Sequence, residues 1–315
     1  MGNSLFSLSN VIRAGTSILM LFLVLYFIGH LLPEQAVYNL LARFISEPGI
    51  TMAIIVAYSA AFVLRALVWK LYIGHAAIPF RIFLNGLLYS LFLNHVLPVK
   101  VGDAARAGYL AHHSGGTVSY ISSFQSVAVL RILDMLFLGG VAAAGSLYAG
   151  YSLYTGWWEL FALIIFIFIP VLYFLQRKFA KIRDFAASAF SLFTSIRGAI
   201  AVLLTGLSWV LESFVLYGTA AMIISGLSFP AAWWTTSVTI AGQVFHFSPG
   251  GIGTYETVMT GTLKLLDLPV ASAYEIAIAS HAFKFIYSYA AGLYLWLAAP
   301  VSFVIIKKWL KKERV

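Results

Sequence analysis

One polar, helix-breaking pattern occurs twice in the chain, as HVLPVKVGD at residues 95–103 and as HFSPGGIGTYE at residues 246–256. Both segments carry His-x-x-Pro-x-x-x-Gly, and each matching position is 151 residues apart in a chain of 315 residues. Proline removes a backbone donor, and glycine allows the helical turn to unwind. One such break in each half of the chain indicates an internal repeat.

The rest of the sequence is apolar. Hydrophobic residues make up 61% and charged residues 10%, with a mean hydropathy of +0.92. Soluble domains carry about 25% charged residues, so the composition predicts a polytopic integral membrane protein. The net charge of +9 lies in a few short segments, which favours a role in membrane orientation over nucleic-acid binding. The lack of cysteine excludes disulfides and thiolate metal sites.

Six stretches approach or exceed the length of about 20 apolar residues that a transmembrane helix needs. They are residues 14–32, 50–70, 118–149, 157–175, 198–226 and 276–306. We interpret the first as a retained span and not a signal peptide, because no small-residue cleavage pattern follows it.

Two further apolar regions, residues 79–113 and 230–268, are interrupted by the repeated pattern. Each half of such a region is too short to cross the membrane easily. We therefore predict two re-entrant helical hairpins, each with its tip inside the membrane. Irregular backbone is tolerated there only where protein packs on it or where it lines a wet cavity. Two full crossings in place of each hairpin is the alternative.

The spacing of 151 residues also relates the spans, because it carries residues 50–70 and 118–149 onto 201–221 and 269–300. Each half of the chain then contains three crossings and one hairpin. An odd number of crossings turns the second copy upside down, as in the inverted repeats that place a transporter's site near the midplane. We therefore expect an all-α fold with an inverted-topology repeat.

The expected organisation is a single transmembrane domain, residues 1–315, made of repeats 1–150 and 151–315. Lysine and arginine gather in residues 177–197 and 307–314, which the positive-inside rule assigns to the cytoplasm. With six crossings the N-terminus is cytoplasmic too, and Arg65 counts among the cytoplasmic charges. We expect a multi-pass protein of the cytoplasmic (inner) membrane.

Four ionisable residues fall well inside the predicted spans: Arg131, Asp134, Glu212 and Lys284. Facing lipid, they would together cost roughly 10 to 14 kcal/mol on insertion scales. They must therefore be paired or hydrated and face the interior.

Arg131 and Asp134 are three residues apart on one helix face, so they either neutralise each other or Asp134 holds Arg131 toward a cavity for an anion. His281 and Lys284 have the same spacing at the corresponding place in the second half. Lys284 has no local acid, so it needs a partner from elsewhere in the protein or from a ligand.

The second limb of each hairpin begins at Gly102 and near Gly253, so both helix N-termini are expected to point inward with free N–H groups for a phosphate. Asp103 is interpreted most simply as an N-cap or first-turn acid. Glu256 is expected to pair with a cation such as Lys284, His281 or Arg131, although a role as a proton carrier stays open.

The matched histidines, His95 and His246, allow two interpretations. Each by itself is most simply satisfied by a backbone carbonyl or a water. Their equivalent placement also allows both to approach one central site as titratable donors. No third ligand is spaced with them for zinc, so we expect neither a metal site nor a cofactor.

Several motifs together resemble the lysylphosphatidylglycerol synthase transmembrane family, also called the flippase-like family. They are Asn94-x-x-x-Pro98-x-x-x-Gly102-Asp103-x-x-Arg106, Arg131-x-x-Asp134, Pro249-Gly250-Gly251-Ile252-Gly253-x-x-Glu256, and Lys284 before an aromatic run that ends at Gly292. The resemblance implies a lipid flippase whose hairpin residues line the headgroup path with Arg131, Asp134 and Glu256. Two departures are Leu130, where the family often has an acid, and the end of the chain at Val315. Bifunctional members continue there into a soluble aminoacyl-transferase domain, so synthase activity is not expected.

We therefore predict a transporter that moves an anionic or aminoacylated phospholipid, or a polyprenyl-linked glycolipid, between leaflets. Its partners are a membrane phospholipid or polyprenyl-phosphate lipid and no nucleic acid, and a homo-oligomer stays open. No catalytic residue is assigned, because no P-loop, Gly-x-Ser-x-Gly or His-Glu-x-x-His motif is present. An intramembrane enzyme acting on a lipid phosphate or headgroup and a proton-coupled carrier of organic anions are the alternatives. The expected binding residues are Asn94, His95, Gly102, Asp103, Arg106, Arg131, Asp134, Glu212, His246, Gly250, Gly251, Gly253, Glu256, His281 and Lys284.

Overall fold

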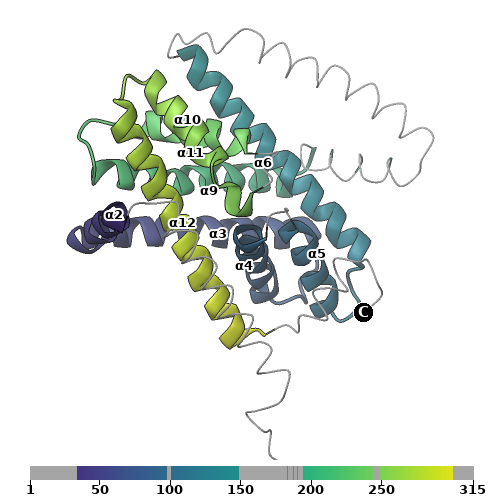
Figure 1. Cartoon of the computed structure of the whole chain (residues 1–315). Helices are drawn as coiled ribbons and strands as arrows, with labels where there is room; N and C mark the ends of the chain where they lie inside the picture. The colour runs from purple at the N-terminus through teal and green to yellow at the C-terminus, as the bar shows by residue number, and fades with distance from the viewer. Residues whose placement is uncertain are drawn as a thin grey trace, which may run out of the picture.

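The computed structural model describes residues 34–97, 101–148, 194–243 and 248–300, and the single residues 183, 187 and 190. Within these residues the secondary structure consists of helices alone, which confirms the predicted all-α class for this part of the chain. Two long helices lie side by side at the centre, and two others run steeply across them (Figure 1).

The helices of the first half begin and end at residues that suit helix boundaries. Their bounds are α2 Glu34–Ser46, α3 Pro48–Ile73, α4 Phe80–Val96, α5 Gly102–His113 and α6 Tyr120–Tyr148. Pro48 occupies the first turn of α3, and Gly74 ends that helix in the left-handed conformation with φ 73°. Helix α2 was not predicted from the sequence.

The second half contains α9 Ile196–Ala221, α10 Phe229–Gly242, the 3-10 turn η1 Pro249–Gly251, α11 Thr254–Leu265 and α12 Val270–Ala298. Serine side chains cap two of these helices. Ser195 accepts a hydrogen bond from the backbone N–H of Gly198, and Ser228 accepts one from Ala231.

The helices of the two halves correspond in order and in length. Helices α3, α4, α5 and α6 have 26, 17, 12 and 29 residues, and α9, α10, α11 and α12 have 26, 14, 12 and 29 residues. The packing corresponds too, because α6 packs on α10 of the second half while α12 packs on α4 of the first.

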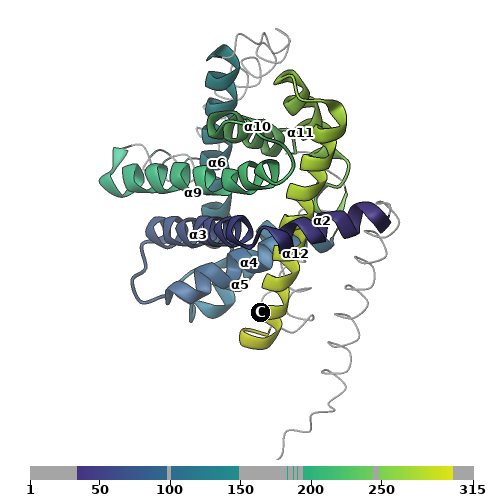
Figure 2. The ribbon, with the colours of Figure 1, turned by 90° about the vertical axis from the view of Figure 1, so that its left-hand side faces the viewer.

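The equivalent helices α3 and α9 form the central pair and run antiparallel (Figure 2). Gly218 near the end of α9 lies against Ile54 near the start of α3, while Gly74 after α3 lies next to Arg197 at the start of α9. A side chain at Gly218 would place its Cβ 2.6 Å from Ile54, so the glycine permits this close approach.

Three described helices are long and apolar enough to cross a membrane: α3, α6 between Tyr120 and Leu147, and α9. They correspond to the predicted spans 50–70, 118–149 and 198–226. Helix α12 is as long as α6, but it is not among the three. Its apolar sequence is interrupted by His281, Lys284 and several tyrosines. It begins at Val270, six residues before the predicted 276–306. The predicted spans 14–32 and 157–175 lie outside the described residues.

Both predicted helix-turn-helix regions contain two helices that pack on each other. Helices α4 and α5 fall in the predicted region 79–113. Helices α10 and α11 fall in 230–268, except that α10 begins one residue earlier, at Phe229. In the first pair the Asn94 side chain accepts a hydrogen bond from the Gly102 backbone N–H at 2.9 Å, while Tyr89 contacts Tyr109 further along. These contacts make α4 and α5 an antiparallel hairpin.

Candidate functional site

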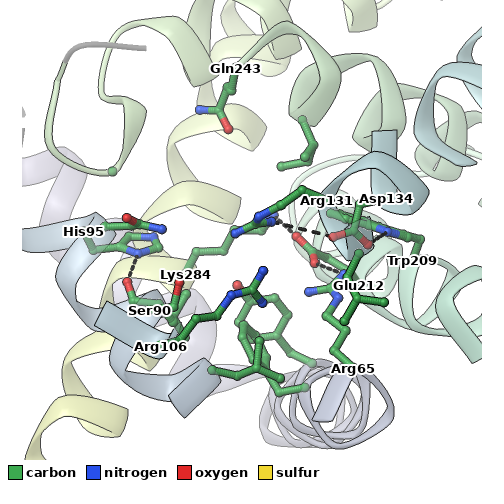
Figure 3. Close-up of a pocket in the computed structure, with 18 of the residues that line it drawn as sticks. Arg65, Ser90, His95, Arg106, Arg131, Asp134, Trp209, Glu212, Gln243 and Lys284 are labelled. Atoms are coloured by element: carbon green, nitrogen blue, oxygen red, sulfur yellow. Dashed lines mark hydrogen bonds and ion pairs between the residues drawn. The ribbon is translucent and has the colours of Figure 1, made fainter. Parts of the chain in front are cut away.

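A cavity of about 190 Å³ lies where helices from both halves of the chain meet. Its walls come from α3 to α6 of the first half and from α9 to α12 of the second (Figure 3). Four cationic side chains line it: Arg65, Arg106, Arg131 and Lys284. Their charges make this cavity the candidate binding site.

Glu212 of α9 joins two of these cations. Its Oε1 accepts a hydrogen bond from Lys284 Nζ of α12 at 2.6 Å, and its Oε2 lies 2.7 Å from a terminal nitrogen of Arg65 of α3. All three side chains are largely buried. A buried carboxylate that contacts two cations is favourable only with such geometry, since each partner offsets the loss of hydration of the other.

Arg131 of α6 forms its main contacts with Asp103 of α5. Its Nε and one terminal nitrogen donate to the two carboxylate oxygens at 2.9 to 3.2 Å, and Asp134 of its own helix lies further away at 3.7 Å. Asp134 in turn accepts a hydrogen bond from the indole of Trp209 at 2.9 Å. The Arg131 side chain is still 40% exposed, so the ion pairs hold it without closing it off from the cavity.

The closest ion-pair contact of Arg106 of α5 is longer than those of the other three cations of the cavity. Its Nε lies 3.2 Å from Asp103, and its guanidinium carbon lies 5.5 Å from the centre of the Trp69 ring. A terminal nitrogen, Nη2, is buried without a hydrogen-bond partner among the described residues. A buried guanidinium with an open donor is prepared for an external acceptor.

His281 of α12 and Glu256 of α11 form a closed pair at the cavity wall. The histidine Nδ1 lies 2.6 Å from the glutamate, and Nε2 lies 3.1 Å from the carbonyl oxygen of Gly250. Tyr255 stacks on the imidazole with ring centres 4.2 Å apart. The structure thus pairs Glu256 with His281, one of the three partners offered by the sequence.

The structure places the predicted binding residues in three groups. Those that line the cavity are Asn94, His95, Arg106, Arg131, Asp134, Glu212, Gly250, His281 and Lys284. Those that do not line it are Gly102, Asp103, Gly251, Gly253 and Glu256. Asp103 and Glu256 act one layer behind the wall by holding Arg131 and His281, and His246 lies outside the described residues.

The expectation of free helix N-termini was wrong for two amide groups. The backbone N–H of Gly102 donates to the Asn94 side chain at 2.9 Å, and that of Gly253 donates to Glu256 at 2.7 Å. Each of these N–H groups already has a side-chain acceptor, as capped helices require. The cations, and not these two amides, are therefore the groups that the cavity offers to an anion.

Asp103 and His95 adopt positions that the sequence allowed. Asp103 lies in the first turn of α5, and it also accepts hydrogen bonds from Arg131 of the next helix. His95 Nδ1 lies 2.8 Å from the carbonyl oxygen of Leu91 one turn earlier, and its ring meets Phe285 edge to face. His95 therefore combines a local contact with a place at the cavity wall.

Sequence reasoning missed several cavity residues: Tyr58, Arg65, Trp209, Gln243 and Tyr255. Arg65 was assigned to the cytoplasmic charges, but it lies within α3 and reaches Glu212. A signal was available, because Arg65 falls inside the predicted span 50–70 and belonged with the other intramembrane ions. The aromatic residues carry no such signal in an apolar chain.

Long apolar helices around a charged cavity define the class as a helical membrane protein. The chain belongs to the family of the lysylphosphatidylglycerol synthase TM region, which it matches over residues 10–292. The predicted resemblance is therefore confirmed, and the family indicates a membrane location and a role that involves lipids. No curated protein and no solved structure matches the chain.

Proposed function

We propose that the protein is a lipid flippase that moves a lipid with an anionic headgroup between the leaflets of the cell membrane. The observation that carries the proposal is the cavity, where four cations are collected among apolar helices. At the centre of a span each cation costs roughly 2.5 to 3.5 kcal/mol on insertion scales. A chain that keeps four of them together gains a site for a negatively charged ligand.

The arrangement that we propose is six crossings and two re-entrant hairpins, α4 with α5 and α10 with α11, in an inverted repeat of halves 1–150 and 151–315. Matching helix lengths and the antiparallel packing of the equivalent helices α3 and α9 support it. In such repeats the site lies between the halves near the midplane, and alternating access follows when the halves rock about it.

Contacts at the ends of the helices support the proposed sides. Arg43 of α2 pairs with Glu275 at 3.0 Å and donates to the carbonyl oxygen of Met222 at 2.7 Å. In the six-crossing arrangement, the loop between spans 14–32 and 50–70, which contains Arg43, lies outside. The ends of spans 198–226 and 276–306 next to Met222 and Glu275 lie on that same side. Gly74, in the loop that follows span 50–70, and Arg197, in the cytoplasmic segment 177–197, also lie together. Both chain termini are then cytoplasmic.

The cavity suggests how a headgroup would be moved. The phosphate of the headgroup would enter the cavity and contact its cations while the acyl chains stay in lipid. Only the polar headgroup then needs a protein environment. Arg131 is positioned for this first contact, because Asp103 holds its guanidinium and leaves it partly exposed. A planar guanidinium binds two phosphate oxygens at once, which suits capture and release of one headgroup.

The test is leaflet exchange in liposomes. Purified protein is reconstituted with a fluorescent phosphatidylglycerol, and the fraction of label open to an external quencher is followed over time. We expect protein-dependent exchange. Exchange at the protein-free rate across several anionic lipids would reject the flippase. Mass analysis of the recovered lipid separates transport from an intramembrane enzyme, because a flippase leaves its lipid chemically unchanged.

A further inference from the structure

We infer that the cavity accepts a headgroup with one net negative charge, held chiefly by Arg106, and disfavours headgroups that carry an ammonium group. The inference rests on the proposed function and narrows its substrate class. Such a cavity would distinguish plain anionic phospholipids from aminoacylated and zwitterionic phospholipids, although all three kinds of lipid carry a phosphate.

The first argument is the charge balance of the cavity. Four cations, Arg65, Arg106, Arg131 and Lys284, are in contact with three carboxylates, Asp103, Asp134 and Glu212. The His281–Glu256 pair adds no net charge when Nε2 donates its proton to the carbonyl oxygen of Gly250, because a second proton is then shared between Nδ1 and the glutamate. The described groups thus leave an excess of one positive charge, which one phosphodiester would neutralise.

The second argument is that every carboxylate oxygen around the cavity already contacts a hydrogen-bond donor or a cation of the protein. Glu212 uses one oxygen for Lys284 and the other for Arg65. Asp134 faces Trp209 and Arg131, and both oxygens of Asp103 accept from Arg131. An incoming ammonium group would have to displace a protein donor to find an acid.

The aromatic rings of the cavity are engaged as well. Arg65 lies 4.1 Å from the centre of the Trp209 ring, and Lys284 lies 5.4 to 5.9 Å from the rings of Tyr255 and Tyr58. Rings of this kind bind ligand ammonium groups when their faces are open. Here they are next to cations of the protein, which would repel a second positive charge.

The third argument assigns the headgroup to Arg106. Its side chain is only 5% exposed, one of its terminal nitrogens is buried without a hydrogen-bond partner among the described residues, and it lines the cavity. Figure 3 shows it reaching toward the middle of the cavity, with Ser90 on one side and Glu212 on the other. Arg65 also has a buried Nε without a hydrogen-bond partner among the described residues, but like Lys284 it is bound to Glu212 and would have to give up that contact.

Because Arg106 is incompletely paired, a role in lipid binding can be distinguished experimentally from a role in holding the fold. A buried cation without full compensation is costly to the folded protein, so its removal is expected to leave the fold as stable or more stable. A residue that serves only to hold the fold would behave in the opposite way. Arg106→Gln should therefore weaken lipid binding while the melting temperature does not fall.

The experiment is a competition assay with the full chain in neutral detergent. A fluorescent phosphatidylglycerol is displaced by unlabelled lipids with identical acyl chains: phosphatidylglycerol, phosphatidylcholine and lysyl-phosphatidylglycerol. We expect phosphatidylglycerol to compete at a concentration at least about tenfold lower than the other two, the scale of one hydrogen bond to a charged group. Equal competition, stronger competition by the lysylated lipid, or no saturable displacement would each overturn the inference.

Arg106→Gln should remove the preference, and Arg81→Gln is the matched control because Arg81 is an exposed arginine at the start of α4. If Arg106→Gln does not fold, Arg106→Lys takes its place, since it keeps the charge and loses the planar fork; it should bind phosphatidylglycerol several-fold more weakly. A retained preference in the folded variant contradicts the inference. A correct preference without leaflet exchange in liposomes would reject the flippase alone.

Discussion

Lys284 of α12 and Arg65 of α3 share one carboxylate, that of Glu212 of α9, at 2.6 Å and 2.7 Å. One buried acid therefore connects three helices from both halves of the chain. Within the described residues, each of the two cations has Glu212 as its ion-pair partner, whereas Glu212 has two cations as partners. Loss of Glu212 should therefore affect the cations more than loss of one cation affects Glu212. This inequality predicts how the three side chains respond to substitution.

Glu212→Gln should destabilise the protein by about 3–5 kcal/mol, because it leaves two buried cations without their counter-charge. Lys284→Gln should cost less, since Glu212 keeps Arg65. The measurement is the free energy of unfolding in detergent from denaturant titration. Combining both substitutions should recover part of the loss of Glu212→Gln alone, and an additive double variant would argue against a shared ion-pair network.

The control for this comparison is the exposed pair between Arg43 and Glu275 at 3.0 Å. Surface ion pairs contribute about 0 to 1 kcal/mol, because solvent screens them. Glu275→Gln should therefore change the free energy of unfolding by less than Glu212→Gln does. A similar loss for both would show that burial does not set the strength of the Glu212 contacts.

Arg131→Gln should slow lipid exchange between leaflets without preventing folding. The guanidinium makes the partly exposed contact of the cavity, and its loss removes one charged hydrogen-bonding group, worth about 1.5–3 kcal/mol or roughly ten- to hundredfold in rate. The measurement is the initial exchange rate in liposomes at equal amounts of folded protein. Folded Arg131→Gln protein with the unchanged rate would remove Arg131 from the headgroup path.

Gly102→Ala should disrupt the α4–α5 hairpin. An added Cβ would lie 2.3 Å from the carbonyl oxygen of Ser90 and 2.7 Å from Asn94, so the helices must separate. We expect a loss on the order of 1–3 kcal/mol, as for other overpacked sites, measured as a lower denaturation midpoint. Gly140→Ala is the control, because a Cβ there meets nothing within 4 Å and alanine favours the helix. Equal effects would contradict the close approach.

The sequence was informative where polarity broke an apolar background. Proline and glycine divided the two apolar regions 79–113 and 230–268 into pairs of helices, and the limits of these regions lie within three residues of the helix ends at Phe80, His113, Phe229 and Leu265. Arg131, Asp134 and Lys284 were recognised for the same reason, because an ion within a span requires a partner. These features are local in the chain, so spacing alone reveals them.

The partners themselves could not be predicted, because they depend on how distant helices pack. Lys284 and Glu212 are 72 residues apart in the chain, and Arg131 contacts Asp103 in preference to its own neighbour Asp134. The spacing of 151 residues does not predict these ion pairs either, since the positions equivalent to Arg65 and Glu212 are Leu216 and Ala61. An asymmetric ion cluster at the contact of two similar halves requires coordinates.

The proposed topology predicts that the two hairpins, α4 with α5 and α10 with α11, enter the membrane from opposite sides. His75, after α3, should face the cytoplasm, and Ala271, at the start of α12, should face the outside; both are exposed. The chain contains no cysteine, so His75→Cys and Ala271→Cys each introduce a single thiol. A membrane-impermeant maleimide should label Ala271→Cys in intact cells and His75→Cys only in inverted vesicles. Labelling of both from one side would rule out the inverted arrangement and leave the two halves without a shared midplane site, although the ion pairs around Glu212 would stand unchanged.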